Sequence, residues 1–187
     1  MILGKVIGDS GCTLVKGDAG IEVTSVCNDS RKVTPGSLFV AVRGYASDGH
    51  SYIATAVEKG AAVIVCEDME AAEAQLAKAG EAAEGVALVK AGSSRHALAI
   101  IAANFYDNPS HKLTLVGITG TNGKTTTVTL LHRMFTAMGY NCGLLSTIAN
   151  YVGTRGTEAV NTTSDPITIN SLMNEWWKRD AVTASWR

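Results

Sequence analysis

The sequence carries no excess of charge of either sign, because 16 Lys and Arg stand against 17 Asp and Glu, for a formal net charge of -1. Proteins that bind nucleic acid through a broad surface usually show a clear basic excess, so we expect no nucleic-acid partner. The sequence also lacks any apolar run near the roughly 20 residues needed to cross a bilayer. We therefore expect no membrane insertion.

Cysteine, proline and aromatic residues are scarce as well. The four cysteines show no Cys-x-x-Cys spacing, so neither a zinc site nor a disulfide scaffold is expected. The first residues lack the charged start and apolar stretch of a signal peptide, which predicts a cytoplasmic protein. Hydrophobic residues nevertheless make up 46% of the 187 residues, and charged residues only 18%. This composition supports a buried core and excludes a disordered chain.

Short β-rich runs alternate with helical runs in the first part of the chain. Strands are expected at 21–26, 38–42, 61–66 and 86–89, and helices at 50–59, 69–83 and 94–106. The segment Asp107-Asn108-Pro109-Ser110 then breaks the pattern and is interpreted as a seam. The expected fold class is α/β, with a small N-terminal domain over residues 1–108.

Beyond the seam, an apolar strand at 113–118 leads into a glycine-rich run. The run reads Thr119-Gly120-Thr121-Asn122-Gly123-Lys124-Thr125-Thr126-Thr127. A helix at 128–138 and a strand at 141–145 complete a β-loop-α-β unit. This order is typical of a loop that binds nucleoside triphosphates, because glycines let amides face phosphate oxygens and a helix N-terminus favours negative charge. Lys124 is predicted to neutralise the phosphates, and the Thr125 hydroxyl to bind Mg²⁺.

The loop departs from the strict Walker pattern, which has glycine where this sequence has Ile118. Gly117 and Gly120 instead give a G-x-x-G-x-x-G-K-T variant. A glycine-rich connection without a ligand is the alternative, and Gly-Lys-Thr-Thr at a strand-to-helix junction argues against it. The pattern indicates ATP binding by Gly120 to Thr126 and says nothing about the second substrate.

The same loop, Gly117 to Thr126, resembles the ATP loop of the Mur ligases, which build the peptidoglycan stem peptide. The segment from Asn28 to Ala41, followed by Asp48-Gly49-His50, resembles their uridine-nucleotide-binding N-terminal domain. The segment Asn161-Thr162-Thr163-Ser164-Asp165-Pro166 is similar to their Asn-Thr-Thr-Pro-Asp loop, with Ser164 in place of proline. Together these segments resemble the MurE type, which adds the third residue of the stem peptide.

The resemblance implies an ATP-dependent ligase that uses ATP and Mg²⁺ and acts as a monomer. ATP would phosphorylate the D-Glu carboxylate of UDP-N-acetylmuramoyl-L-Ala-D-Glu, and the amine of meso-diaminopimelate or L-lysine would attack the acyl phosphate. The implied catalytic residue is Lys124, and the implied metal ligand is Thr125. The residues implied for the UDP-sugar substrate are Asn28, Ser30, Tyr45, Ala46, Ser47, Asn161, Thr162 and Thr163.

Several of these residues have a plainer interpretation. Asp29-Ser30-Arg31 could form a turn or a surface ion pair. Thr162-Thr163 and Asp165 could cap a helix that begins just after them, because their side chains accept hydrogen bonds from free amides. His50 and His96 are interpreted as solvated or helix-face histidines, since no metal-ligand spacing joins them.

After Glu175 the sequence changes character. All three tryptophans fall within residues 176–187, which show no apolar periodicity. Restoring one A before the codon of Trp176 makes the segment begin Met-Val-Glu, and suitable codons continue it toward a strand typical of the family. We therefore interpret 176–187 as an out-of-frame tail, and 109–175 as the beginning of an incomplete P-loop, parallel-sheet ATPase domain.

The chain as written lacks the family's magnesium-binding glutamate, its carbamylated lysine and its amino-acid pocket, so we expect it not to catalyse ligation. Two other functions stay open. One is a non-catalytic module that binds the UDP-sugar, and the other is a related ligase such as a folylpolyglutamate or cyanophycin synthetase. The segments around Asp29 and Asp48 argue against the related ligase, because they resemble the UDP-sugar branch.

Overall fold

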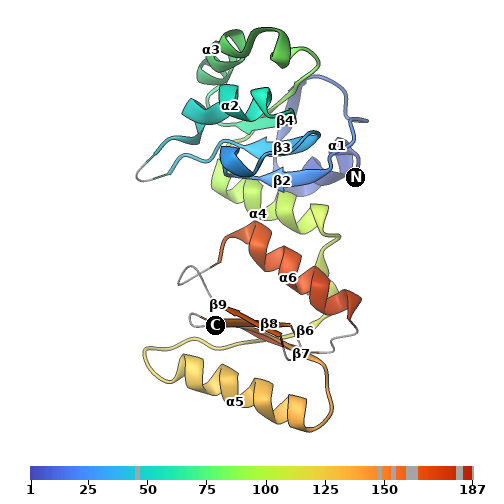
Figure 1. The fold of residues 1–187 in the computed structure, drawn as a ribbon, viewed down its shortest axis with the longest axis vertical. Helices are drawn as coiled ribbons and strands as arrows, with labels where there is room; N and C mark the ends of the chain where they lie inside the picture. Colours follow the sequence, from blue (N-terminus) through green and yellow to red (C-terminus); the bar gives the residue numbers. More distant parts are fainter. Residues whose placement is uncertain (45–46, 147–148, 153–154, 159–163, 180–182, 187) are drawn as a thin grey trace. The chain divides into compact units, whose positions relative to one another are not determined.

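In a computed structural model the chain forms two compact units, unit 1 over Met1–Phe105 and unit 2 over Tyr106–Arg187 (Figure 1). The structure describes residues 1–44, 47–146, 149–152, 155–158, 164–179 and 183–186. Among these residues, no helix combines the length and the apolar character needed to span a bilayer. The boundary expected from the sequence follows residue 108, and the structural division follows Phe105.

Unit 1 is built on a five-stranded sheet in the order β1-β5-β4-β3-β2. Its strands are β1 (Thr13–Lys16), β2 (Ser25–Cys27), β3 (Ser37–Val40), β4 (Ala61–Cys66) and β5 (Ala87–Lys90). Strands β2 to β5 are parallel, and β1 pairs with β5 in the antiparallel sense. The parallel strands therefore bring the segments that follow Cys27, Val40, Cys66 and Lys90 to one edge of the sheet.

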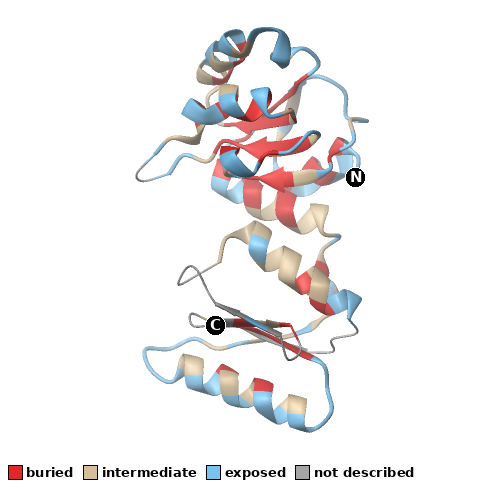
Figure 2. Cartoon of the chain, viewed as in Figure 1, coloured by how far each residue is buried: buried red, intermediate tan, exposed pale blue. Residues whose placement is uncertain are grey.

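Helices cover both faces of this sheet, which explains why its central strands are almost continuously apolar (Figure 2). The helices are α1 (Leu3–Ile7), α2 (Ile53–Glu58), α3 (Met69–Ala79) and α4 (Ser94–Phe105). The 3₁₀ turns are η1 (Gly8–Ser10), η2 (Ser30–Lys32), η3 (Gly49–Tyr52) and η4 (Gly80–Ala83). Phe39 and Ile64 from the sheet and Ile53 from α2 belong to one buried cluster, the core of the unit.

Unit 2 contains a mixed five-stranded sheet in the order β6-β10-β7-β8-β9. Its strands are β6 (Thr114–Gly117), β7 (Cys142–Leu145), β8 (Ala149–Val152), β9 (Arg155–Glu158) and β10 (Thr183–Trp186). Strands β6, β10 and β7 run parallel, whereas β8 and β9 are antiparallel additions. Helix α5 (Lys124–Ala137) and helix α6 (Pro166–Lys178) lie on opposite faces of the sheet, and η5 (Pro109–Lys112) precedes β6 (Figure 1).

The starts of α5 and α6 differ in how they match the expectations from the sequence. The helix after the glycine-rich run begins at Lys124 rather than at residue 128, so the lysine lies in the helix and not in the loop. Helix α6 has Asp165 as its N-cap, and the carboxylate accepts hydrogen bonds from the amides of Ile167 and Thr168 at 3.0 and 3.1 Å. The capping interpretation of Asp165 is therefore confirmed.

Candidate functional site

The loop between β6 and α5 is shaped by two glycines. Gly123 is the N-cap of α5 and has φ +76°, and Gly120 has φ +142°. Both values lie in a region that strains residues with a Cβ, so the backbone path needs glycine at these positions. The residues from Thr119 to Gly123 are exposed, while Lys124 and Thr125 are half-buried.

Lys124 folds back over this loop. Its Nζ donates hydrogen bonds to the carbonyl oxygens of Gly120 and of Thr121, the latter at 3.2 Å. The first turn of α5 contains no acidic residue, and Gly123 offers no side chain to cap it. Because the first amides of a helix have no intrahelical acceptor, they and the ammonium group form a positively polarised end of the helix. This arrangement suits an anion such as a triphosphate.

The position of Thr125 fits a magnesium ion that arrives with a nucleotide. Thr125 is the second residue of α5, beside the lysine. Mg²⁺ in phosphate sites takes most of its ligands from phosphate oxygens and water, so one protein hydroxyl suffices. Within the described ranges, no group of three or more His, Cys, Asp or Glu side chains could hold a metal alone.

At the carboxyl edge of the unit 1 sheet, Asn28 follows β2 and is exposed, whereas Ser30 is buried in η2. The Asp29 carboxylate accepts a hydrogen bond from the Arg31 amide at 3.0 Å and pairs with the Arg31 guanidinium at 2.8 Å. These hydrogen bonds lower the pKa of Asp29 to about 2. The interpretation of this segment as a turn with an ion pair is confirmed, and the turn leaves the Asn28 side chain exposed.

Further along this edge, the described residues 42–44 and 47–49 pair with each other, and this pair is called here the 42–49 hairpin. The Gly49 amide donates to the Val42 carbonyl at 2.9 Å, and the Gly44 amide donates to the Ser47 carbonyl at 3.0 Å. A Cβ on Gly49 would lie 2.6 Å from the Val42 nitrogen, so the close backbone approach requires glycine. Ser47 is exposed near the tip, while Tyr45 and Ala46 lie outside the described residues.

The third predicted segment cannot be placed in the same way. Asn161, Thr162 and Thr163 lie outside the described residues, and the described chain resumes at Ser164. Asp165, which follows, accepts a further hydrogen bond from the Thr168 hydroxyl at 2.7 Å. Among the described residues, those of the glycine-rich loop thus lie in unit 2, and Asn28, Ser30 and Ser47 lie in unit 1 on the segments that follow β2 and β3.

Of the two expectations for His50, a solvated or a helix-face histidine, the solvated one is wrong, and the residue lies in η3. Its side chain is buried, with the residue 3% exposed. Nδ1 lies 2.5 Å from the Asp48 carboxylate, and Nε2 lies 3.2 Å from the amide nitrogens of both Glu67 and Asp68. His96, in contrast, is exposed on α4 as expected. Sequence reasoning missed His50 because its contacts come from a segment far along the chain.

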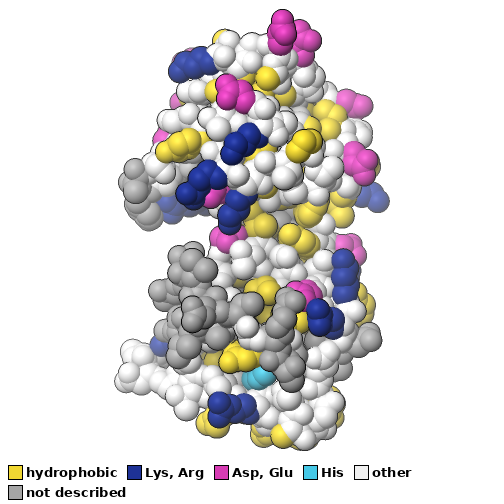
Figure 3. Space-filling model, in the orientation of Figure 1, with side chains coloured by type: hydrophobic (Ala, Val, Ile, Leu, Met, Phe, Trp, Pro, Cys, Tyr) yellow, Lys and Arg dark blue, Asp and Glu magenta, His cyan; other side chains and the backbone are white. Residues whose placement is uncertain are grey.

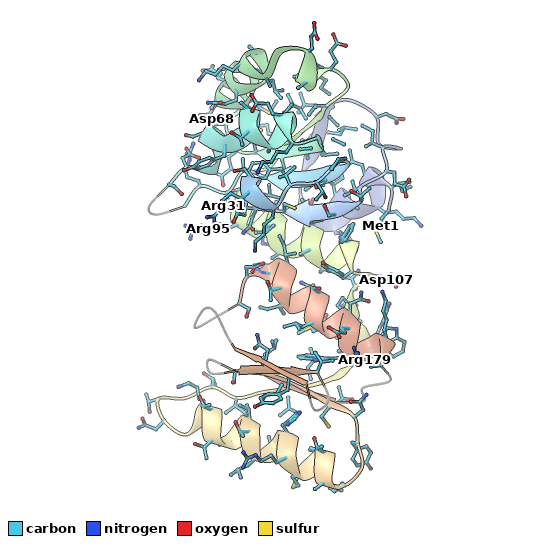
Figure 4. The ribbon with its side chains drawn as sticks, viewed as in Figure 1. Met1, Arg31, Asp68, Arg95, Asp107 and Arg179 are labelled. Carbon is cyan, nitrogen blue, oxygen red and sulfur yellow. The ribbon has the colours of Figure 1, made fainter. Side chains whose placement is uncertain are left out.

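A polar network extends from this histidine across the edge of the sheet. The Glu67 carboxylate accepts hydrogen bonds from the amide and the hydroxyl of Ser94, both at 2.6 Å, and so caps the start of α4. These hydrogen bonds lower the pKa of Glu67. Arg43 lies 3.7 Å from Asp48 and 3.8 Å from Asp68. Arg31, Asp68 and Arg95 lie on the same side of unit 1 (Figure 4), where basic side chains gather on the surface (Figure 3).

The Glu67 cap predicts a loss of stability in acid. Its pKa is lower in the folded chain than its unfolded value of about 4.3, so its stabilisation is complete above that pH and is lost as the pH falls through the folded pKa. We expect Glu67→Gln to lower the free energy of unfolding by about 1 kcal/mol at pH 7, because the hydrogen bonds to Ser94 lose their ionic part.

Urea unfolding followed by far-UV circular dichroism at pH 7 and pH 4 measures this effect. The difference between Glu67→Gln and the parent chain should shrink at the lower pH. Glu84→Gln is the control, because Glu84 is exposed and lies outside this network. An equal loss of stability for the two variants at pH 7 would show that Glu67 has no special role.

The sequence was compared with known families and proteins. Residues 22–106 match the Mur ligase family catalytic domain, and residues 118–184 match the Mur ligase middle domain. A ligase of Cytophaga hutchinsonii named UDP-N-acetylmuramoyl-L-alanyl-D-glutamate–2,6-diaminopimelate ligase is 48% identical over 88% of this chain. An equally named ligase of Clostridium acetobutylicum is 44% identical over 94% of it. The chain spans 32% and 34% of these two relatives, about a third of their length.

Solved structures show the same fold. A structure of UDP-N-acetylmuramoyl-L-alanyl-D-glutamate–2,6-diaminopimelate ligase aligns with all of this chain, with a TM-score of 0.73 and 18% identity, and 35% of its own length is covered. The MurF ligase from Thermotoga maritima in complex with ADP aligns with 87% of this chain, with a TM-score of 0.54 and 25% identity, over 31% of its length. The α/β fold class expected from the sequence is thereby confirmed.

Proposed function

The chain belongs to the Mur ligase family, and on that premise we propose that it provides the ATP loop and the UDP-sugar-binding domain of a ligase that adds meso-diaminopimelate to UDP-N-acetylmuramoyl-L-Ala-D-Glu. The observation that carries the proposal is the N-terminal end of α5. There Lys124 and the first helix amides, which have no intrahelical acceptor, meet a loop shaped by Gly120 and Gly123. The names of the relatives favour diaminopimelate over L-lysine as the amino acid added.

The chemistry divides between the two units. In unit 2, Lys124 and the first amides of α5 would neutralise the β and γ phosphates of ATP, and Thr125 would hold the Mg²⁺ that binds with them. In such a ligase an oxygen of the D-Glu carboxylate attacks the γ phosphorus and ADP leaves. The amine of the amino acid then displaces phosphate from the acyl phosphate. In unit 1, Asn28, Ser30 and Ser47 would contact the uridine nucleotide, with Tyr45 and Ala46 beside them in sequence.

The remaining assignments follow from the family. Asn161, Thr162 and Thr163 would hold the muramoyl-dipeptide end of the substrate. We propose a monomer that works in the cytoplasm, where UDP-sugar precursors and ATP are both present.

Isothermal titration calorimetry tests the binding proposal directly. The chain should bind UDP-N-acetylmuramoyl-L-Ala-D-Glu and ATP with Mg²⁺ in separate titrations. A phosphate-release assay with both substrates and diaminopimelate measures whether turnover above background accompanies this binding. Binding of a folate or of a cyanophycin primer in place of the UDP-sugar would favour the related ligases. If the chain binds the UDP-sugar but does not bind ATP with Mg²⁺, the result favours a non-catalytic module that binds the UDP-sugar.

We also propose that residues 176–187 are read in a shifted frame. The supporting observation is the placement of every tryptophan in this segment and the Met-Val-Glu reading that one added base restores. The alternative is that this segment is read in frame and folds with the rest of unit 2. Three observations favour it: α6 continues to Lys178, β10 pairs with β6 and β7, and the match to the middle domain reaches residue 184. Sequencing the DNA after codon 175 decides between them, because an intact frame through Arg187 contradicts the proposal.

A further inference from the structure

His50 connects two segments of unit 1 that are distant in sequence. Through Nδ1 it contacts Asp48 in the 42–49 hairpin, and through Nε2 it contacts the amides of Glu67 and Asp68, which follow β4. The Asp48 carboxylate also accepts a hydrogen bond from the His50 amide at 3.0 Å, so this end of the hairpin is held at two points. The imidazole thus ties the hairpin to the next turn of the sheet edge, where the ion pair of Arg43 with Asp68 at 3.8 Å adds a second connection.

The hydrogen-bond partners of His50 determine which ring nitrogen carries the proton. Two amide groups point at Nε2, and an amide can only donate, so Nε2 must accept and carry no proton. The proton of the neutral ring therefore lies on Nδ1, from which it is donated to Asp48. A second proton on Nε2 would remove both acceptor contacts. The arrangement requires one tautomer of the neutral imidazole.

The turn that His50 holds is itself fixed by two helices. The Glu67 carboxylate caps the start of α4 at Ser94, and the Asp68 carboxylate accepts a hydrogen bond from the Ala71 amide at 3.0 Å and caps α3. Capping contacts of this kind hold a backbone turn in place against its helices. His50 therefore anchors a short hairpin to a point that the two helices define.

We propose that His50 is a positioning residue for the sugar nucleotide. As the Nδ1-protonated imidazole, it holds the 42–49 hairpin against the turn at Glu67 and Asp68 and so sets the place of Ser47. This inference rests on the proposed function, which assigns Ser47 to the uridine nucleotide. It adds a buried residue that does not touch the substrate, and whose loss acts on affinity through the hairpin.

Two variants separate the contacts of the ring. An asparagine amide can replace Nδ1 as a donor to Asp48 but is too short to reach the turn, whereas a glutamine oxygen can replace Nε2 as the acceptor. We expect His50→Asn to raise the Kd for UDP-N-acetylmuramoyl-L-Ala-D-Glu about tenfold, and His50→Gln to keep it within about threefold. His96→Asn is the matched control, because His96 is exposed on α4.

The measurements are calorimetry and amide hydrogen exchange on the 187-residue chain, with nitrogen NMR of the histidine rings. In His50→Asn, exchange should quicken at Glu67, Asp68, Gly44 and Gly49, while the Kd for ATP with Mg²⁺ stays unchanged. Unchanged exchange and unchanged UDP-sugar affinity in His50→Asn would overturn the proposal, as would a proton on Nε2 of the parent chain. If His50→Asn does not fold, two other results decide on the proposal. They are the Kd of His50→Gln for the UDP-sugar and the position of the ring proton of His50 in the parent chain.

Failure of the proposed function would give other results than failure of the positioning role of His50. A parent chain that does not bind the UDP-sugar contradicts the proposed function and, with it, the role of His50 toward that ligand. In that case the exchange rates still decide whether His50 anchors the hairpin. A parent chain that binds, together with a His50→Asn variant that binds equally well, contradicts the positioning role alone.

Discussion

Replacing Lys124 with alanine is expected to weaken the binding of ATP with Mg²⁺ by about 100-fold, which corresponds to about 2.7 kcal/mol. The lysine ammonium lies at the N-terminal end of α5 and donates to the loop carbonyls of Gly120 and Thr121. A triphosphate in this loop offers the ammonium charged acceptors in place of neutral carbonyls. Charge-assisted hydrogen bonds of this kind are roughly twice as strong as neutral ones.

The matched control for this variant is Arg133→Ala. Arg133 is exposed on the same helix, so its removal changes the net charge equally without touching the loop. Calorimetric titration at one fixed ionic strength compares the two variants with the parent chain. A loss of less than about threefold for Lys124→Ala, or an equal loss for Arg133→Ala, would show that the loop does not bind the phosphates as proposed.

The glycine-rich turn between β6 and α5 could be predicted from sequence because its requirements are local. Glycines that permit unusual φ values, a lysine and a helix must follow an apolar strand in order, and all of them are visible in the sequence. The start of α5 was nevertheless placed too late. The run Thr125-Thr126-Thr127 has low helix propensity, which favoured a loop, whereas the structure places these residues in the first turn.

The role of His50 could not be predicted, because it depends on contacts across the sheet. The sequence placed this residue at the start of a helix at 50–59, but the structure forms η3 first and begins α2 only at Ile53. The Asp48-x-His50 spacing gave a weak signal, since the Asp48 carboxylate accepts from the His50 amide. The partners at Glu67 and Asp68 become neighbours only through the parallel pairing of β3 with β4.

Short edge elements were missed for a related reason. Strands β1 and β9 lie at the edges of their sheets, β8 lies beside β9, and each of these strands has only four residues. Their strand conformation depends on the partner they pair with, and a short segment carries little periodicity of its own. The segment after Glu175 showed no apolar periodicity, yet α6 continues to Lys178 and buries Trp176 beside Met173. One large side chain is enough to extend the buried face of that helix.

The packing of Trp176 predicts that Gly143→Ala will severely destabilise unit 2. Gly143 lies in β7, and a Cβ there would be 2.2 Å from Cε2 and 2.3 Å from Cδ2 of the Trp176 ring. The ring is only 1% exposed, and its Nε1 donates to the Tyr151 carbonyl at 2.9 Å, so it cannot move aside without losing that bond. We expect a loss of about 3 kcal/mol, which moves the urea midpoint of unit 2 down by about 1 to 2 M.

Tryptophan fluorescence measures this loss in unit 2 alone, because all three tryptophans lie in that unit. Gly117→Ala is the matched control, since Gly117 lies in the same sheet and a Cβ there meets nothing within 4 Å. Trp176→Ala leaves a cavity beside Gly143, so the added methyl should cost little more in the double variant Gly143→Ala, Trp176→Ala than in Trp176→Ala alone. Independent, additive losses would mean that the glycine is required for another reason than the tryptophan ring.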